Sequence, residues 1–259
     1  MTQHRPRKRF GQHFLTDPVA ISEIIELVET SADATLIEIG PGTGVLTGPL
    51  MEHCNRLVAI EIDRDLATSL RHRFADQPTF ELIEIDALKL KLSDLVDRPV
   101  SIVGNLPYNI STPLLFHLFA QRSLIESMLF MLQKEVVERM AAAPGSKQYG
   151  RLSVMTQYFC EVEPLLEIPP EAFDPPPKVD SQMVRLQPRQ TAHDDHPLEA
   201  ALSKLVTAAF SQRRKTLRNT LAGLCDSEAI LAAGCDPKAR AETLSLNQFI
   251  ELARRFNDQ

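Results

Sequence analysis

The first two thirds of the chain alternate short apolar runs with stretches in which apolar residues recur three and four positions apart. Apolar runs bounded by Gly, Pro or acidic residues are typical of strands buried on both faces, and the longer period indicates helices packed on a sheet. The predicted strands are 35–39, 57–60, 80–85, 100–104, 127–132, 162–168 and 182–186. Helices are predicted at about 18–30, from after Gly44 to about 54, at about 64–74 and 112–120, and from about 134.

This alternation of strands and helices predicts a parallel α/β sheet with right-handed crossovers. The segment 188–196 is polar and loosely patterned, which indicates a linker. Beyond it the pattern predicts helices only, at 198–210, 212–224 and 246–256. We therefore expect an α/β domain over residues 1–188, with a basic N-terminal arm, and a small all-helical domain over residues 189–259.

Composition narrows the class of protein. Of the 259 residues, 44% are hydrophobic and 24% are charged, which is ordinary for a soluble globular protein. The four cysteines form no C-x-x-C pair, which favours a reduced compartment and argues against a zinc site. We find neither a signal-peptide pattern nor an apolar run long enough to cross a bilayer. A soluble cytoplasmic protein without a metal is expected, and nothing demands more than a monomer.

The net charge of −6 is distributed unevenly along the chain. Residues 1–13 carry a net charge of +4, residues 14–187 carry −11, and residues 188–259 carry +1. Two basic clusters on an acidic body can bind a phosphate backbone, although charge runs are often only solvated surface. The clusters are Arg5, Arg7, Lys8 and Arg9, and Arg213, Arg214, Lys215 and Arg218.

A glycine-rich loop, residues 40–44, lies between the first predicted strand of the sheet and a helix. Glycines such as Gly40 and Gly42 allow the backbone to approach a ligand closely near a helix N-terminus. The spacing is not that of a dinucleotide-binding loop, and no lysine follows as it would in a nucleoside triphosphate-binding loop. The loop alone does not identify the ligand.

Acidic residues end the next two predicted strands. Glu61 is placed to accept both hydroxyls of a ribose, and Asp86 to accept the amine of an adenine, although both could be ordinary solvated acids. Together with the glycine loop and Asn105 on the fourth strand, they favour a Rossmann-like methyltransferase that uses S-adenosylmethionine. The loop would then hold the methionine part of this cofactor.

The four residues that follow the fourth strand, Asn105-Leu106-Pro107-Tyr108, place an amide, backbone carbonyls and an aromatic ring at the edge of the sheet. This arrangement suits a planar base with an exocyclic amine, because the oxygens can accept its N–H groups while the ring stacks on the base. The alternative is an ordinary proline turn.

The chain resembles the ribosomal RNA adenine dimethyltransferases over nearly its whole length. Each shared motif could arise by chance, but all five in this order are highly specific. They lie at residues 7–15, 37–44, 105–111, 173–181 and 212–218. The resemblance implies methyl transfer from S-adenosylmethionine to N6 of two adjacent adenosines in the 3′-terminal hairpin loop of 16S rRNA. The partner would be the small ribosomal subunit or its precursor.

The resemblance also implies residue roles. Cofactor contacts would fall on His13, Leu15, Gly40, Glu61, Asp86 and Asn105. The family often has Asn where this chain has His13, which can still form a hydrogen bond through a ring nitrogen. The family's pattern implies that Tyr108 stacks on the flipped adenine, and Phe173 either covers its other face or packs in the core.

The chemistry expected of the turn is hydrogen bonding to the reacting amine. Asn105 and the carbonyl of Leu106 or Pro107 would accept both N–H groups of N6, and the basic clusters would contact rRNA phosphates. Three alternatives remain open from the sequence: methylation of adenine in DNA, methylation of a small molecule, and a main role as a ribosome-assembly checkpoint or a transcription-associated binding factor.

Overall fold

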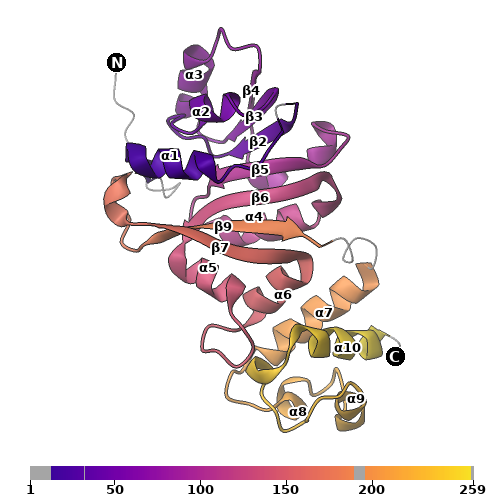
Figure 1. Cartoon of the computed structure of the whole chain (residues 1–259). Coiled ribbons are helices and arrows are strands. Elements are labelled where there is room, and N and C mark those ends of the chain that lie inside the picture. The colour runs from indigo at the N-terminus through magenta and orange to yellow at the C-terminus, as the bar shows by residue number, and fades with distance from the viewer. Residues whose placement is uncertain (1–12, 32, 190–195, 258–259) are drawn as a thin grey trace. The chain divides into compact units, whose positions relative to one another are not determined.

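The computed structural model describes residues 13–31, 33–189 and 196–257 of the chain (Figure 1). They form two packed units: the described residues of 1–137 and 163–188, here the sheet unit, and those of 138–162 and 189–259, here the helical unit. In the helical unit, residues 138–162 pack with the C-terminal helices. For example, the Gly145 amide donates to the Glu242 carbonyl at 2.7 Å, and Tyr149 packs edge-on against Phe210.

The central feature is a seven-stranded sheet in the order β4-β3-β2-β5-β6-β9-β7. Neighbouring strands from β4 to β6 are parallel, and β6 and β9 are antiparallel. The expectation of a wholly parallel sheet was therefore wrong at β9. A parallel neighbour requires a long crossover, and the connection between residues 168 and 181 contains no crossover helix. The strands are β2 (Thr35–Ile39), β3 (Arg56–Glu61), β4 (Phe80–Glu84), β5 (Val100–Asn105), β6 (Ile125–Gln133), β7 (Cys160–Ile168) and β9 (Ser181–Pro188).

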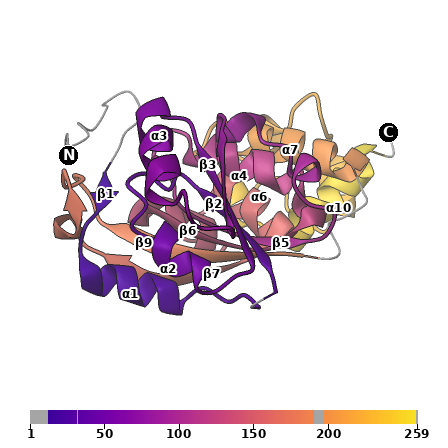
Figure 2. The ribbon, with the colours of Figure 1, turned by 90° about the horizontal axis from the view of Figure 1, so that it is seen from above.

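Helices cover both faces of this sheet, with α1 and α2 on one face and α4 on the other (Figure 2). Alternate residues of each strand face opposite sides. Leu36 of β2 and Val103 of β5 join a buried cluster with Ile24 of α1 and Leu50 of α2. The helices of the sheet unit are α1 (Pro18–Glu26), α2 (Thr47–Met51), α3 (Arg64–Arg73) and α4 (Ser111–Phe119), and α5 (Lys134–Ala141) runs across the unit boundary. Short 3-10 turns are η2 (Ala87–Lys89), η3 (Leu92–Asp94), η4 (Arg122–Leu124) and η5 (Pro170–Ala172).

A second, two-stranded sheet joins the N-terminal segment to the end of the sheet unit. Strand β1 (Phe14–Leu15) pairs antiparallel with β8 (Phe173–Asp174), with Leu15 opposite Phe173. Both of these apolar side chains are buried in the same cluster as the α1 face of the large sheet. Two-residue strands carry no periodicity, so the sequence pattern did not predict them.

The helical unit contains α6 (Arg151–Phe159), α7 (His196–Ala209), α8 (Leu217–Thr220), α9 (Ser227–Ala232), η7 (Ala241–Thr243) and α10 (Leu246–Asn257). The predicted helices at 198–210 and 246–256 are confirmed, and no helix was predicted at α6 or α9. The predicted helix at 212–224 was wrong, because only the four residues of α8 are helical there. The amides of Leu217 and Arg218 donate to the carbonyls of Ala239 and Pro237 and not to those of a preceding helical turn.

Among the described residues, no helix combines the length and apolar character that a membrane span requires.

Candidate cofactor and acceptor site

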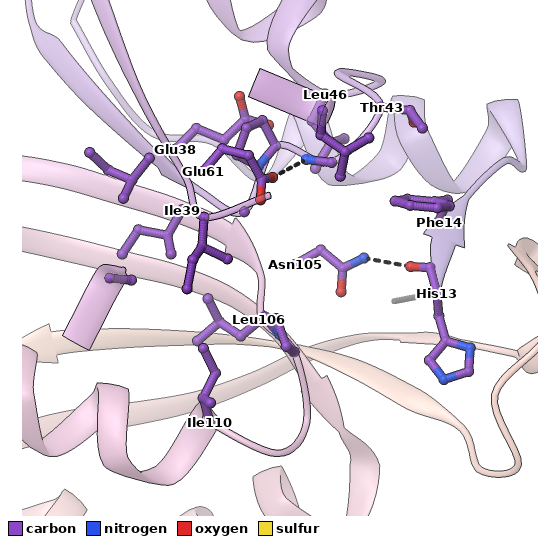
Figure 3. A pocket seen from close by; sticks show the side chains of 18 of the residues that line it. His13, Phe14, Glu38, Ile39, Thr43, Leu46, Glu61, Asn105, Leu106 and Ile110 are labelled. Carbon is purple, nitrogen blue, oxygen red and sulfur yellow. Dashed lines mark hydrogen bonds between the residues drawn. The ribbon is translucent and has the colours of Figure 1, made fainter. Parts of the chain in front are cut away.

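A cavity of about 300 Å³ opens in the sheet unit where β2, β3 and β5 end. Strand order reverses between β2 and β5, since β3 and β4 lie to one side of β2 and β5 and β6 to the other. Ligands of open α/β sheets bind at the carboxyl ends of the strands at such a point. Figure 3 shows the walls: Glu38 and Ile39 from β2, Glu61 from β3, Asn105 at the end of β5 with Leu106 after it, and His13 and Phe14 from the N-terminal segment.

The glycine loop lies against two other walls of the cavity. Gly40 and Gly42 have φ angles of 71° and 58°, which favour glycine. A Cβ on Gly42 would lie 3.2 Å from the Phe14 ring, and one on Gly40 would lie 3.4 Å from the Asn105 carbonyl. The loop is therefore close to both the N-terminal segment and the turn that follows β5.

Gly104 explains how β5 comes so close to β2 at the site. It lies opposite Ile39 in the parallel pair, and a Cβ on it would be 2.5 Å from the Ile39 carbonyl oxygen. Real Cβ atoms are not found so close to a backbone atom, so only glycine fits here without a shift of the strands. The sequence shows Gly104 only as the end of an apolar run, which is why its role was not predicted.

The two acids predicted from the strand ends both line the cavity. Glu61 is 5% exposed, and its carboxylate accepts the amide of Asp63 at 2.8 Å and that of Gly42 at 3.2 Å. Burial raises the pKa of Glu61, and these amide hydrogen bonds oppose the rise. Asp86 precedes η2 and accepts the Leu88 amide at 3.0 Å. Both carboxylates are thus fixed by backbone N–H groups at the cavity wall.

A third acid, Glu38, was not predicted as a site residue. It is 2% exposed, it lines the cavity, and its carboxylate accepts the Thr47 hydroxyl at 2.7 Å. Burial, with a smaller contribution from the nearby Glu61, raises its pKa to about 7 against the Thr47 hydrogen bond. The Glu38–Thr47 contact ties the end of β2 to the start of α2 on either side of the glycine loop. A buried acid in a strand cannot be told from an exposed one by spacing alone.

The turn after β5 holds its amide in a defined orientation. The Asn105 side-chain nitrogen donates to the His13 carbonyl at 3.3 Å, as the dashed line in Figure 3 shows. This leaves Oδ1 as the atom that the side chain offers as an acceptor. The Pro107 carbonyl already accepts the Ile110 amide at 3.1 Å, and the Leu106 amide donates to Met131 at 3.2 Å.

The aromatic ring of the turn is restrained at two points. The Tyr108 hydroxyl forms a 2.7 Å hydrogen bond with Ser181, and burial raises the pKa of Tyr108. The His13 ring stacks on the Tyr108 ring with centroids 5.8 Å apart and planes at 25°. The His13 ring is in turn held by a 2.7 Å hydrogen bond between Nδ1 and the Pro175 carbonyl.

The structure brings together most of the predicted site residues. His13, Leu15, Gly40, Gly42, Glu61, Asp86, Asn105, Leu106, Pro107 and Tyr108 all line the cavity. Phe173 does not: it is 4% exposed, it lies opposite Leu15 and it belongs to the core cluster. In the helical unit the Arg213 to Arg218 cluster is exposed. The predicted contacts at Arg5, Arg7, Lys8 and Arg9 lie outside the described residues.

The strand order, the glycine loop, the acids at the strand ends and the acceptor turn define an S-adenosylmethionine-dependent methyltransferase. The sequence model of the ribosomal RNA adenine dimethylases matches residues 3–258. The chain belongs to the ribosomal RNA adenine dimethylase family.

Individual relatives agree with this assignment. The chain is 51% identical to "Ribosomal RNA small subunit methyltransferase A" of Pseudomonas putida over 99% of this chain and 97% of that protein. Among solved structures it is similar to a dimethyladenosine transferase from Plasmodium falciparum, with a TM-score of 0.83 and 28% identity over 95% of this chain and 98% of the other. It is also similar to the 23S rRNA methyltransferase ErmE, with a TM-score of 0.73 and 28% identity over 95% and 100% of the two chains.

These comparisons confirm the predicted family, the methyltransferase fold, the enzyme class and the cofactor. The residues present fit S-adenosylmethionine, because the cavity offers carboxylates for its hydroxyl, amine and cationic groups. Within the described ranges, no group of three or more His, Cys, Asp or Glu side chains is placed to hold a metal ion.

The buried carboxyl of Glu38 predicts that cofactor binding releases a proton near neutral pH. The cofactor carries a net positive charge, and a cation in the cavity lowers the pKa of Glu38 below its value of about 7 in the free protein. Below pH 7 binding must displace that proton, so affinity falls by up to about tenfold per pH unit as the pH drops. Above pH 7 the acid is already ionised and the affinity levels off.

Titration calorimetry in buffers with different heats of ionisation measures this proton release directly. Glu38→Gln should remove most of the release and flatten the affinity below pH 7. A release that is unchanged in Glu38→Gln would assign the proton to another group, of which Glu61 is the first candidate.

Proposed function

We propose that this enzyme dimethylates N6 of two adjacent adenosines in the 3′-terminal hairpin loop of 16S rRNA, acting as a cytoplasmic monomer on the small subunit or its precursor. The main support for this proposal is that the acids expected to bind the cofactor and the Asn105 turn line the same cavity. Full-length similarity to proteins named small subunit methyltransferase A supports the choice of RNA.

The proposed chemistry is mainly positioning. The cofactor supplies an electrophilic methyl group on a sulfonium. Oδ1 of Asn105 accepts one N–H of the adenine amine, because Nδ2 is held by the His13 carbonyl. The Leu106 carbonyl is the better second acceptor, since that of Pro107 already serves Ile110. Two acceptors favour a pyramidal N6, free its lone pair and stabilise the positive charge that develops on it, and the proton then leaves to solvent.

The remaining residues of the site hold the two reactants. Gly40, Gly42 and Leu15 shape the methionine end of the cavity, Glu61 accepts the ribose hydroxyls, and Asp86 accepts the cofactor's adenine amine. Tyr108 stacks on the target adenine. Phe173 supports the site from the core by packing with Leu15 under the N-terminal segment, rather than by stacking on the base.

RNA phosphates are proposed to bind an exposed basic surface of the helical unit. The 237–239 loop is hydrogen-bonded to the amides of Leu217 and Arg218, which brings Lys238 and the adjoining Arg240 next to the predicted cluster. Sequence reasoning missed these cations because they lie 20 to 26 residues away from Arg214, Lys215 and Arg218 along the chain. The surface consists of Arg214, Lys215, Arg218, Lys238 and Arg240. The arm residues Arg5, Arg7, Lys8 and Arg9 are proposed to add phosphate contacts.

Arg213 differs from its neighbours, because its guanidinium is used within the helical unit. It forms a 3.0 Å ion pair with Glu242 and donates to the Lys147 carbonyl. We therefore assign Arg213 a structural role in holding the 211–216 bend, and the RNA contacts to the other cations.

Charge reversal separates these two roles. Arg214→Glu with Arg218→Glu should weaken RNA binding at low salt by at least tenfold and reduce the salt slope by about 0.7 to 0.9 per lost phosphate contact. Cofactor affinity should not change. Arg213→Ala serves as the matched control: it should lower the free energy of unfolding while leaving the salt slope unchanged. A parallel loss of RNA and cofactor binding in the double variant would mean that these residues are structural.

The proposed substrate is tested by incubating undermethylated small subunits with the protein and S-adenosylmethionine. Dimethylated N6 cannot pair, so primer extension should stop at two adjacent adenosines near the 3′ end of 16S rRNA. Stops elsewhere in the RNA would contradict the proposed position. Preferential methylation of a DNA competitor would favour the DNA alternative.

A further inference from the structure

The acceptor turn is attached to a residue that the proposed chemistry does not use. Ser181 is the first residue of β9, it lies opposite Gln133 of β6 in the antiparallel pair, and it is 0% exposed. Because the sheet fixes its backbone, its hydroxyl has a fixed position next to the turn.

The Ser181 hydroxyl forms a hydrogen bond with the Tyr108 hydroxyl, which lies at the end of the ring opposite to Cβ. The Ser181 and Tyr108 oxygens are 2.7 Å apart, and the two residues are 73 positions apart in the chain. An aromatic ring attached only through its Cα can still rotate about two side-chain bonds. The phenol oxygen lies on the axis of the Cβ–Cγ bond, so a hydrogen bond there restricts the swing of the ring about Cα–Cβ, while the stacked His13 ring limits rotation of the ring plane on one side.

We infer that Ser181 is a positioning residue for methyl transfer, which fixes the position of the Tyr108 ring on which the acceptor adenine stacks. The inference rests on the proposed function, since it requires a base on Tyr108. Transfer needs N6 in line with the methyl group, and a small misplacement of the base lowers the rate steeply. Ser181 contacts neither the cofactor positions nor the reacting atoms, so it acts through Tyr108.

The test is a pairwise cycle of Ser181→Ala, Tyr108→Phe and the double variant, with dimethylation of undermethylated small subunits measured in single turnovers. Each single variant should lose roughly tenfold in rate, and the double variant should lose about the same rather than the product, because both changes remove one hydrogen bond. Cofactor affinity should stay unchanged. Tyr108→Phe also covers the case in which Ser181→Ala does not fold.

The sheet offers a matched control in the hydroxyl pair of Ser101 and Ser127, which lie 3.1 Å apart in β5 and β6. Ser101→Ala removes a comparable hydrogen bond near the start of β5 and should leave the rate within twofold. If Ser101→Ala slowed methylation as much as Ser181→Ala does, the cause would be a general destabilisation of the sheet. That result would overturn the inference.

A spectroscopic measurement separates positioning from stability. The chain has three tyrosines and no tryptophan, so fluorotyrosine labelling gives three fluorine resonances. Tyr108→Phe identifies one of them, and Ser181→Ala should shift or broaden that one and not the other two. Equal rates for Ser181→Ala and the unsubstituted protein overturn the inference alone. Absence of methylation by the unsubstituted protein overturns the proposed substrate, and with it this inference.

Discussion

Asn105→Ala is expected to slow methyl transfer by at least about 100-fold, the size of effect seen when one oriented hydrogen-bonding group is removed from a reacting centre. The variant loses the Oδ1 acceptor for N6, and it also loses the bond between Nδ2 and the His13 carbonyl that orients the amide. The rate is measured in single turnovers at saturating cofactor, so that a weaker cofactor contact does not contribute.

Asn105→Asp separates the effect of losing the acceptor oxygen from the effect of losing the bond that orients the side chain. Aspartate keeps an acceptor oxygen but places a second oxygen against the His13 carbonyl, where the native amide donates. We expect an intermediate rate, slower than the native enzyme and faster than Asn105→Ala. A native rate in Asn105→Ala would remove this residue from the chemistry and leave the backbone carbonyls to carry it.

Gly104→Ala is expected to have the second largest effect, on both folding and cofactor binding. The new Cβ would lie 2.5 Å from the Ile39 carbonyl oxygen, in the middle of the sheet where neither strand can move freely. Overpacking of this kind costs about 1–3 kcal/mol or more in the free energy of unfolding. Because the displaced strands carry the glycine loop and Asn105, cofactor affinity should also fall by more than tenfold. Denaturant unfolding and titration calorimetry measure the two effects.

Gly48→Ala provides the control within the same unit. Gly48 lies in α2, and a Cβ on it would meet nothing closer than a Phe74 ring carbon at 4.0 Å. Alanine should therefore fit there, and it should stabilise the helix by up to about 1 kcal/mol. Equal destabilisation by both substitutions would mean that the close approach of β5 to β2 is not the cause.

Site residues that come at the ends of predicted strands could be found from the sequence. Residues whose role depends on tertiary packing could not. The glycine loop, Glu61, Asp86 and Asn105 each come directly after an apolar run, so a parallel sheet collects them at one edge. Glu38 lies inside a run, and its burial against Thr47 depends on a helix whose position no local pattern gives.

The same distinction explains the errors in the helical part. Residues 212–224 have good helical composition, but the amides of Leu217 and Arg218 donate to the carbonyls of Ala239 and Pro237, so no helix runs from residues 212–216 into α8. The break separates Arg213, which pairs with Glu242, from cations that face solvent. Likewise the contact between Ser181 and Tyr108 joins residues 73 positions apart, which only the folded sheet brings together.

The central claim is that the Asn105 turn presents adenine N6 to the cofactor for two successive transfers. Mass spectrometry of nucleosides from undermethylated small subunits, incubated with the protein and S-adenosylmethionine, tests it most directly. The account predicts N6,N6-dimethyladenosine with the native protein and at most a trace with Asn105→Ala in the same incubation time. Cofactor binding without any methylated adenosine from the native protein would contradict it.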